Sequence, residues 1–389
     1  MLKKHKEEHP IELLDQIKLL APGTKLRTAI DDIIMAQFGA ILVFIDSQNI
    51  NDPIFQGGFD INCNFAPEKL YELAKMDGAI ILDLEAQKIL KANVHLLPDQ
   101  KFNTPETGMR HRAADRTSQH LQCMVLAISK RRNALTIYYN KNKYLLKDVK
   151  LLLTRVGQAL DTLEKYRGIF DDKLKQLNDA EIQNTVNLYD IIEIIIKGIK
   201  ILRIKEYMDS FVVELGIEGY LVKVQLDENV LEMESYLAFI IMDYRNQEDC
   251  KQDNVKKDEL KQERPEQDTV EEFTEEKARE MVNTLTKIRE LSPLVVCKNL
   301  GYDFSNNNQI DEYPVSPHGY RFLKYVARLP MYIAKNLVDE FQSLAKIQKT
   351  DIETLKKVEG VGTKRATTIF KTLRRKYTDD RVTDLTIDF

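Results

Sequence analysis

Apolar positions in the first part of the chain alternate between helical spacing and short unbroken runs. Helical spacing predicts an amphipathic helix over residues 7–20, which Pro22-Gly23 ends, and Thr24 can cap a second helix that continues to Met35. A further helix is predicted from Pro67, and another over residues 110–120. Because helices and strands interleave, residues 1–147 are predicted to form an α/β domain with a mixed sheet. The runs that predict strands are residues 40–45, 79–82, 89–97, 124–129 and 135–139.

From residue 148 the strand pattern is lost. Apolar stripes at helical spacing run through residues 151–170 and 182–202, and they predict long helices. Residues 148–316 are therefore expected to form a helical spine or bundle. Residues 245–280 are more than half charged, and their first part is expected to be a solvated loop or a frayed helix.

The segment from Pro317 contains an internal repeat. Residues 326–337 align without gaps onto residues 358–369, with Val326 on Val358 and Ala334 on Ala366. Two copies are too few for a solenoid, but they suit a pseudo-symmetric pair of helix-turn-helix units. The predicted fold class is therefore a multidomain α/β plus all-α protein, whose third domain spans residues 317–389.

The composition of the chain excludes several classes of protein. With 389 residues, of which 43% are hydrophobic and 30% charged, the chain has an ordinary globular balance and room for two or three domains. A net charge of -4 excludes a chain that coats nucleic acid over its whole surface. No apolar run approaches the roughly 18 residues of a membrane span, and no secretory signal is found. Four cysteines without a CxxC pair (Cys63, Cys123, Cys250, Cys297) argue against a zinc ribbon or a disulfide scaffold and fit a cytoplasmic protein.

The second copy of the repeat has the features of a DNA-binding helix-hairpin-helix motif. Residues 358–362 predict a tight hairpin, in which two glycines allow the backbone to approach a phosphate closely. The amides of Val361 and Gly362, at the start of the next helix, offer donors to that phosphate. Residues 345–377 hold ten basic and three acidic residues, which favours a polyanion as partner. The residues predicted to bind DNA are Gly360, Val361, Gly362, Thr363, Lys364 and Arg365.

Binding at this hairpin is expected to be directed to the DNA backbone and independent of sequence, because no base-reading side chains stand out. The alternative is a protein–protein module with a solvated basic face. In the first copy, Arg328 and Pro330 replace the two glycines, so that hairpin is expected to pack rather than bind.

Two motifs of the first domain have residues suited to phosphate chemistry. Arg110 and Arg112 follow Gly108 at the start of a predicted helix and can clamp a phosphate. Asp77, at a helix-to-strand junction, can bind a metal or activate a hydroxyl group. Taken alone, Asp-Gly is a turn and Arg-His-Arg is a solvated helix start, so the residues by themselves leave a catalytic site open. The P-loop ATPases are excluded because GxxxxGK[ST] is missing.

These motifs carry a resemblance to a known family. Lys75-Met76-Asp77-Gly78-Ala79 and Gly108-Met109-Arg110-His111-Arg112 resemble the DGA and RHR motifs of diadenylate cyclase domains. Residues 56–59 and 129–133 are also similar to that family. A cyclase domain followed by a helical spine and a helix-hairpin-helix tail resembles the bacterial DNA integrity scanning proteins over essentially the whole chain.

The resemblance implies an enzyme that condenses two ATP molecules into cyclic di-AMP and releases two pyrophosphates. It implies two sites that face each other across a dimer interface, within a homo-octamer. Asp77 would bind Mg²⁺ or Mn²⁺ and orient the attacking hydroxyl, and Arg110, His111 and Arg112 would complete the catalytic set. The nucleotide-binding residues that the resemblance implies are Gly78, Ala79, Leu96, Gly108, Met109, Ala113, Ser129, Lys130 and Arg132.

The resemblance also implies regulation. Branched or junction DNA would bind the tail and inhibit synthesis, as a DNA-integrity checkpoint at the nucleoid. Met109, Ala113 and Lys130 depart from residues that are common in the family, and a lysine lacks the bidentate fork of an arginine. The departures at Met109 and Lys130 motivate an alternative: a structure-selective DNA-binding scaffold whose nucleotide site binds ATP or cyclic di-AMP without efficient turnover.

The remaining candidates have plainer interpretations. The histidines form no metal-ligand spacing. Tyr138, Tyr139 and Tyr144 lie in or beside a predicted strand and are expected at the sheet surface rather than as stacking platforms.

Overall fold

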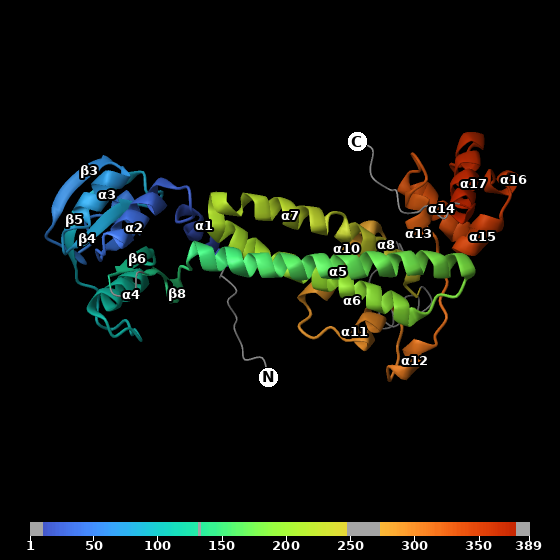
Figure 1. The fold of residues 1–389 in the computed structure, drawn as a ribbon, viewed down its shortest axis with the longest axis horizontal. Helices are drawn as coiled ribbons and strands as arrows, with labels where there is room; N and C mark the ends of the chain where they lie inside the picture. Colours follow the sequence, from blue (N-terminus) through green and yellow to red (C-terminus); the bar gives the residue numbers. More distant parts are fainter. Residues whose placement is uncertain (1–10, 131–133, 247–272, 379–389) are drawn as a thin grey trace, which may run out of the picture. The chain divides into compact units, whose positions relative to one another are not determined.

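A computed structural model describes residues 11–130, 134–246 and 273–378, with the elements labelled in Figure 1. The chain divides into two compact units, the first made of Met1–Leu160 with Glu206–Asp227 and the second of Asp161–Lys205 with Glu228–Phe389. The long helices α5 (Val149–Gln183) and α6 (Leu188–Leu215) contribute residues to both units. None of the helices within the described ranges has the length and apolar character needed to cross a membrane.

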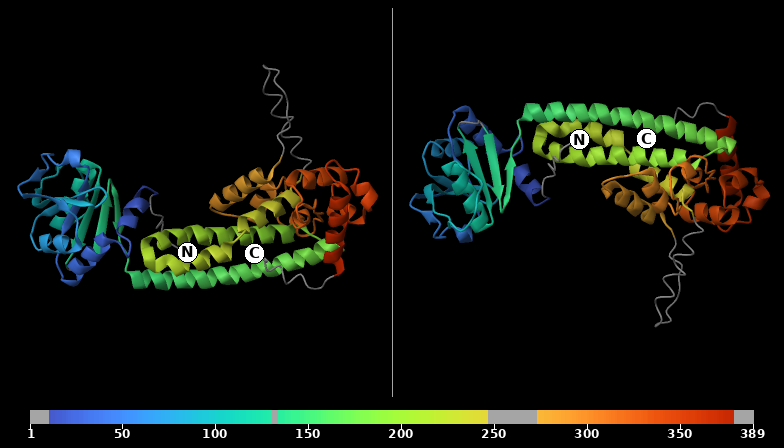
Figure 2. Two further views of the ribbon diagram at one scale, coloured as in Figure 1. Left: turned by 90° about the horizontal axis from the view of Figure 1, so that it is seen from above. Right: turned by 90° about the horizontal axis from the view of Figure 1, so that it is seen from below.

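A mixed sheet of eight strands forms the centre of the first unit, as the sequence predicts (Figure 2). Seven strands follow the order β2-β5-β4-β1-β6-β7-β8, and β3 pairs with β5. Strands β1 and β4 pair in parallel, and the other pairs named here are antiparallel. The strands are β1 (Ile41–Ile45), β2 (Phe55–Gln56), β3 (Phe59–Asn64), β4 (Ala79–Asp83), β5 (Lys88–Leu96), β6 (Met124–Ser129), β7 (Ala134–Tyr139) and β8 (Asn142–Leu145).

Helices cover both faces of this sheet (Figure 2). Successive residues of a strand point to opposite faces, so Phe44 and Ile45 of β1 enter different apolar clusters. The cluster around Phe44 includes buried side chains of three helices, and the cluster around Ile45 includes Ala114 of α4. The helices on the first face are α1 (Ile11–Leu19), α2 (Lys25–Met35) and α3 (Pro67–Leu73), and α4 (Met109–Leu121) lies on the second.

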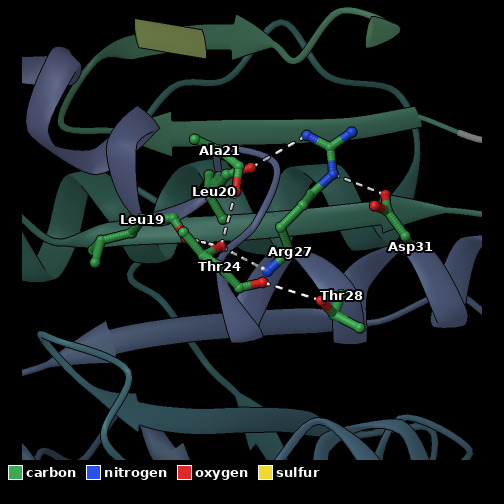
Figure 3. A network of polar contacts seen from close by, with 7 residues as sticks. All are labelled: Leu19, Leu20, Ala21, Thr24, Arg27, Thr28 and Asp31. Carbon is green, nitrogen blue, oxygen red and sulfur yellow. Dashed lines mark hydrogen bonds and ion pairs between the residues drawn. The ribbon is translucent and has the colours of Figure 1, made fainter. Parts of the chain in front are cut away.

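Thr24 caps α2, as the sequence predicts (Figure 3). Its hydroxyl oxygen accepts a hydrogen bond from the amide of Arg27 at 3.1 Å and lies 2.9 Å from the carbonyl oxygen of Leu19. Arg27 extends the network through an ion pair with Asp31 at 2.8 Å. The cap therefore joins the end of α1 to the start of α2, and such a cap contributes about 1 kcal/mol.

The second unit is helical, as predicted for the middle and end of the chain. Helix α8 packs against α10 and α13, and its residues 237–244 are all buried. The predicted loop within residues 245–280 falls mostly on residues 247–272, which lie outside the described residues. The remaining helices are η1 (Ser47–Asn49) and η2 (Gly216–Gly219), both 3-10, then α7 (Tyr220–Val230), α8 (Met233–Tyr244), α10 (Glu275–Lys287), α11 (Pro293–Asn299), α12 (Asn308–Asp311), α13 (Tyr320–Lys324), α14 (Met331–Phe341), α15 (Leu344–Lys349), α16 (Ile352–Leu355) and α17 (Thr363–Thr378).

A buried group of charged side chains joins α5, α8 and α13 within this unit. Arg321 forms an ion pair with Glu181 and donates to Asn178 Oδ1 at 2.7 Å. The carboxylate of Asp243 accepts the backbone amides of residues 319–321 at 2.6–3.0 Å and so caps α13. Residues of the predicted spine and of the predicted C-terminal domain therefore share one buried core.

Candidate functional site

Four neighbouring strands bring predicted site residues to one edge of the sheet. Strands β1 and β4 are parallel, with Leu42 opposite Ile80. Continuing this register by three residues places Gly39 and Asp77 at equivalent positions, just before the two strands begin. Neighbouring strands lie about 4.8 Å apart, so these two positions are adjacent.

The antiparallel strands β5 and β6 end at the same edge. The pair Ala79–Val94 in β4 and β5, continued by two residues, sets Leu96 opposite Asp77. The pair Ile41–Ala127 in β1 and β6, continued likewise, sets Ser129 opposite Gly39. The structure thus gathers residues that lie far apart in the sequence. Along the edge their order is Leu96, Asp77, Gly39 and Ser129.

Asp77 is exposed between α3 and β4, on a backbone that its neighbours hold in place. The amide of Gly78 donates to Asn93 Oδ1 at 3.1 Å. A Cβ atom at Gly78 would lie 2.3 Å from the backbone carbon of Asn93, so a larger residue does not fit there. Ala79 is buried at the start of β4 and contributes packing. Asn93 has a positive φ of 56° within β5, a feature for which the sequence contains no pattern.

The second motif begins α4. Gly108 is its N-cap and has no side chain to cap the helix, so the first-turn amides are left for other acceptors. Met109 is 86% exposed, and Arg112 is exposed as well. Ala113 follows the first turn of α4 and is half-buried. The start of α4 therefore presents backbone donors and a guanidinium group to solvent.

Arg110 connects this helix start to the sheet edge. A Cβ atom on Gly39 would lie 2.2 Å from Arg110 Nη1, so the guanidinium group lies directly against the Gly39 backbone. Because Gly39 is adjacent to the position of Asp77, the structure brings together the two motifs that the sequence singled out. Sequence analysis missed Gly39, whose one clue is a glycine directly before the apolar run of β1.

His111 contacts a residue that the sequence analysis placed wrongly. Tyr138, expected at the sheet surface, is 1% exposed, because its side chain lies under α4. Its hydroxyl lies 2.9 Å from His111 Nδ1. Glu106, in the loop before α4, forms an ion pair with Lys143. Burial raises the pKa of Glu106, but the hydrogen bond and charge of Lys143 and the nearby Tyr138 outweigh burial, so this pKa lies below its ordinary value. Sequence analysis missed Glu106 too.

The last two predicted nucleotide-binding residues follow Ser129 in the sequence. Lys130 lies in an exposed turn directly after Ser129, which is half-buried at the end of β6. Arg132 lies outside the described residues.

Only one carboxylate in the site, that of Asp77, was predicted to bind a metal. Across the described ranges, no group of three or more His, Cys, Asp or Glu side chains could hold a metal ion. Mg²⁺ in nucleotide sites often binds one or two carboxylates together with substrate phosphates and water. Asp77 therefore fits a metal that is shared with a polyphosphate rather than one held by the protein alone.

The C-terminal repeat has equivalent backbones in its two copies, α13–α14 and α16–α17. Arg328 and Gly360 occupy the same hairpin position, and both have a positive φ, of 56° and 82°. Arg328 is exposed, so the first hairpin presents a cation at its tip. Equivalent hydrogen bonds close the hairpins, from the amide of Leu329 to Val326 at 3.1 Å and from the amide of Val361 to Val358 at 3.0 Å.

The second hairpin presents most of its predicted DNA-binding residues to solvent. Gly362, Thr363 and Lys364 are exposed at the start of α17. Arg365 is also exposed, and its Nη1 donates to the carbonyl of Gly360 at 2.9 Å, which braces the hairpin. Val361 requires a correction: its side chain is buried and its amide already donates within the hairpin, so it is not a phosphate donor.

Comparisons with known proteins cover nearly the whole chain. The family model described as DisA bacterial checkpoint controller nucleotide-binding matches residues 27–143, and the model of the DisA linker region matches residues 146–309. The chain is 42% identical over 364 residues to the DNA integrity scanning protein DisA of Thermotoga petrophila, covering 94% of this chain and 97% of that protein. It is 39% identical over 374 residues to the DisA of Bacillus subtilis, covering 95% of each.

Proposed function

Because this chain belongs to the DisA family of DNA integrity scanning proteins, we propose that it condenses two ATP molecules into cyclic di-AMP and that DNA controls the reaction. Its nucleotide-binding domain makes it a diadenylate cyclase, an enzyme of the nucleotidyltransferase class. The observation that carries the proposal is the sheet edge, where Asp77 precedes β4 and Arg110, from the N-terminus of α4, lies against Gly39 before the adjacent strand β1.

In the proposed reaction, the 3′-hydroxyl of one ATP attacks the α-phosphorus of the other. An oxygen–phosphorus bond forms, the bond to the β-phosphate oxygen breaks, and pyrophosphate leaves. A second transfer with the roles reversed closes the ring. Each sheet edge binds one ATP, so two protomers must face each other to align the hydroxyl with the phosphorus. Such alignment supplies much of the rate in phosphoryl-type transfers.

Arg110 and the start of α4 bind the phosphates in this proposal. The Arg110 guanidinium is half-buried against Gly39, so its position is set before ATP arrives. Arginine donors and helix N-terminal amides are both suited to phosphate oxygens. Exposed Arg112 reaches phosphate from the same helix turn, and Leu96 and Ser129 flank the nucleotide on neighbouring strands.

Asp77 would hold Mg²⁺ or Mn²⁺ together with the ATP phosphates and would orient the attacking hydroxyl. When bound, the metal would neutralise charge that develops on the phosphate oxygens. We expect Asp77→Asn to keep the fold but to lower synthesis at least about 100-fold, because an amide lacks the charge for a metal. Asp60→Asn is the matched control, since Asp60 is exposed on β3 and pairs with Lys91. Near-normal synthesis by Asp77→Asn would remove Asp77 from the chemistry.

DNA binds the second hairpin through its phosphates. The support is the exposed start of α17, with Gly362, Thr363 and Lys364, in a segment rich in basic residues. In an oligomer such as the expected octamer, the hairpin is present several times. A DNA junction offers several backbone arms at once and can engage several hairpins, which gives it an avidity that a linear duplex lacks.

Turnover with and without DNA tests the proposal. The protein is incubated with ATP and Mg²⁺ or Mn²⁺, and cyclic di-AMP is measured by chromatography, with a four-way junction, a linear duplex or no DNA. We expect synthesis in all three samples and the lowest rate with the junction. Equal rates, with junction binding verified by gel shift, would contradict regulation. Absence of product in every sample would support the alternative of a binding scaffold without turnover.

A further inference from the structure

We infer that Tyr332 stacks on an unpaired base of bound DNA, so that the C-terminal repeat prefers DNA in which the two strands part. The inference rests on the proposed function, in which the second hairpin binds DNA phosphates. Tyr332 is the second residue of α14 and is 60% exposed, so much of the residue is open to solvent.

The internal repeat places Tyr332 on the face that is proposed to bind DNA in the second copy. The alignment of residues 326–337 with residues 358–369 sets Tyr332 on Lys364. Each is the second residue of the helix that follows its hairpin, α14 or α17, and each is exposed. The first copy therefore has an aromatic ring at the position where the second copy has a cation for phosphate.

Contacts between the two copies hold this ring beside the second hairpin. A Cβ atom on Gly360 would lie 3.5 Å from Tyr332 Cε2. One turn further along α14, Asn336 Nδ2 donates to the carbonyl of Glu359 at 3.1 Å. Because α14 is fixed to the hairpin at both places, a nucleotide next to a phosphate bound at Gly362 can reach the ring.

The first copy is suited to a base rather than to a phosphate. Pro330 stands where the second copy has Gly362, and a proline has no N–H to donate. A tyrosine offers no positive charge to a phosphate, but every base has a flat face on which an aromatic ring can stack. In a continuous duplex the neighbouring base pairs cover these faces, so only an unpaired base, as at a fork, can stack on Tyr332. Arg328, exposed at the tip of the first hairpin, can supply a charge for the phosphate of that nucleotide.

A tryptophan reporter in the full chain tests the contact, because the chain contains no tryptophan. Tyr332→Trp places one indole at this position, and stacking on a base quenches indole emission. We expect a fork with unpaired thymine arms to lower the emission by about half or more. The same fork with abasic arms keeps the phosphates but lacks the bases, so it should change the emission little, as should a blunt duplex. Tyr220→Trp, at a residue that is 68% exposed on α7, is the matched control and should respond to none of these DNAs.

The affinity for DNA gives a second measurement. At fixed salt, Tyr332→Ala should weaken binding of the fork about fivefold or more and leave binding of the blunt duplex within about twofold, because only the stacking is lost. Tyr332→Phe keeps the ring and should bind the fork as the parent does. Thermal melts check that each variant remains folded.

Two results would overturn the inference. One is a fork affinity of Tyr332→Ala equal to that of the parent. The other is an indole emission that the bound fork does not change, or that the fork and the abasic fork change equally, since the ring would then face a phosphate or another protein. Either result, with DNA still bound, leaves the proposed function standing. A parent that binds none of these DNAs would instead contradict the proposed DNA binding, and this inference with it.

Discussion

At the scale of single residues, two glycines allow close contacts with the backbone that fix where the charged groups of the site lie. Arg110 is held beside the sheet edge because Gly39 leaves room for its guanidinium group. Asp77 is held because Gly78 donates to Asn93 and fits closely against it. The two glycines therefore help to set the positions of the arginine and the aspartate.

Gly39→Ala is expected to lower cyclic di-AMP synthesis about tenfold or more, because small misplacements of a phosphate-binding group have large effects on rate. The added methyl group would lie 2.2 Å from Arg110 Nη1, at the flexible end of a long side chain. The guanidinium group can move away and the backbone stays, so the melting temperature should change little. Steady-state turnover and thermal melts check both parts. Gly157→Ala, where a Cβ meets nothing within 4 Å, is the control. Full activity of Gly39→Ala would contradict the placement of Arg110.

The raised pKa of Glu181 leads us to expect that the stability of the protein depends on pH. Burial raises its pKa from 4.5 to about 7, although the nearby charge of Arg321 acts in the opposite direction. The folded protein therefore binds this proton more tightly than the unfolded chain does. The contribution to stability is complete below about pH 4.5 and is lost as the pH rises through about 7.

Glu181→Gln cannot ionise, so its stability relative to the parent should rise between about pH 5 and about pH 8. Urea unfolding midpoints of both proteins at the two pH values measure this difference. A difference that stays constant with pH would show that Glu181 does not titrate in this range.

At the scale of elements, Gly360 and Gly362 have different structural roles in the second hairpin. Gly360 has a φ of 82°, which side chains disfavour, and a Cβ there would lie 3.1 Å from Ile333. A larger residue at Gly360 would therefore strain this hairpin. A Cβ on Gly362 meets nothing within 4 Å, so this position is open toward solvent at the start of α17.

Gly362→Glu should therefore weaken DNA binding without unfolding the hairpin. A carboxylate at the helix N-terminus repels phosphate, and we expect the affinity for a four-way junction to fall about tenfold or more at fixed salt. Gel shifts and thermal melts measure the two effects. Gly168→Glu introduces the same charge on an exposed face of α5 and serves as the control. Unchanged affinity would move DNA binding away from this hairpin.

At the scale of the whole molecule, the proposed reaction needs two ATP molecules, and each sheet edge is proposed to bind one. Specific activity is therefore expected to fall when the protein is diluted below the concentration at which protomers associate. Light scattering and turnover, measured over the same dilution series, check this. A monomer with full activity at every concentration would exclude facing sites.

The buried charges of the second unit affect how domains can be separated. A chain that ends at residue 316 lacks Arg321, which leaves Glu181 and Asp243 buried without this partner. Removing one side of a buried ion pair costs about 3–5 kcal/mol. Single substitutions in the hairpin therefore separate DNA binding from stability better than a deletion does.

The sequence alone determined the elements whose burial follows a regular period. Strands β1, β4 and β6 lie within one residue of their predicted bounds, and Thr24 caps α2 as predicted. The two motifs were found because Asp77 and Arg110 stand in local patterns. Strands β2, β3 and β8 were missed because they are short or largely exposed and have no apolar run.

Only the tertiary structure decided which residues meet. The sheet order β5-β4-β1-β6 places Leu96, Asp77, Gly39 and Ser129 along one edge. That order depends on how long-range strand pairs bury both faces of the sheet, and no local pattern encodes it. The position of Tyr138 also depends on tertiary structure, because the strand pattern alone does not decide which face of the sheet this side chain occupies. It is buried against His111 because α4 packs over β7, a contact between segments that lie 27 residues apart.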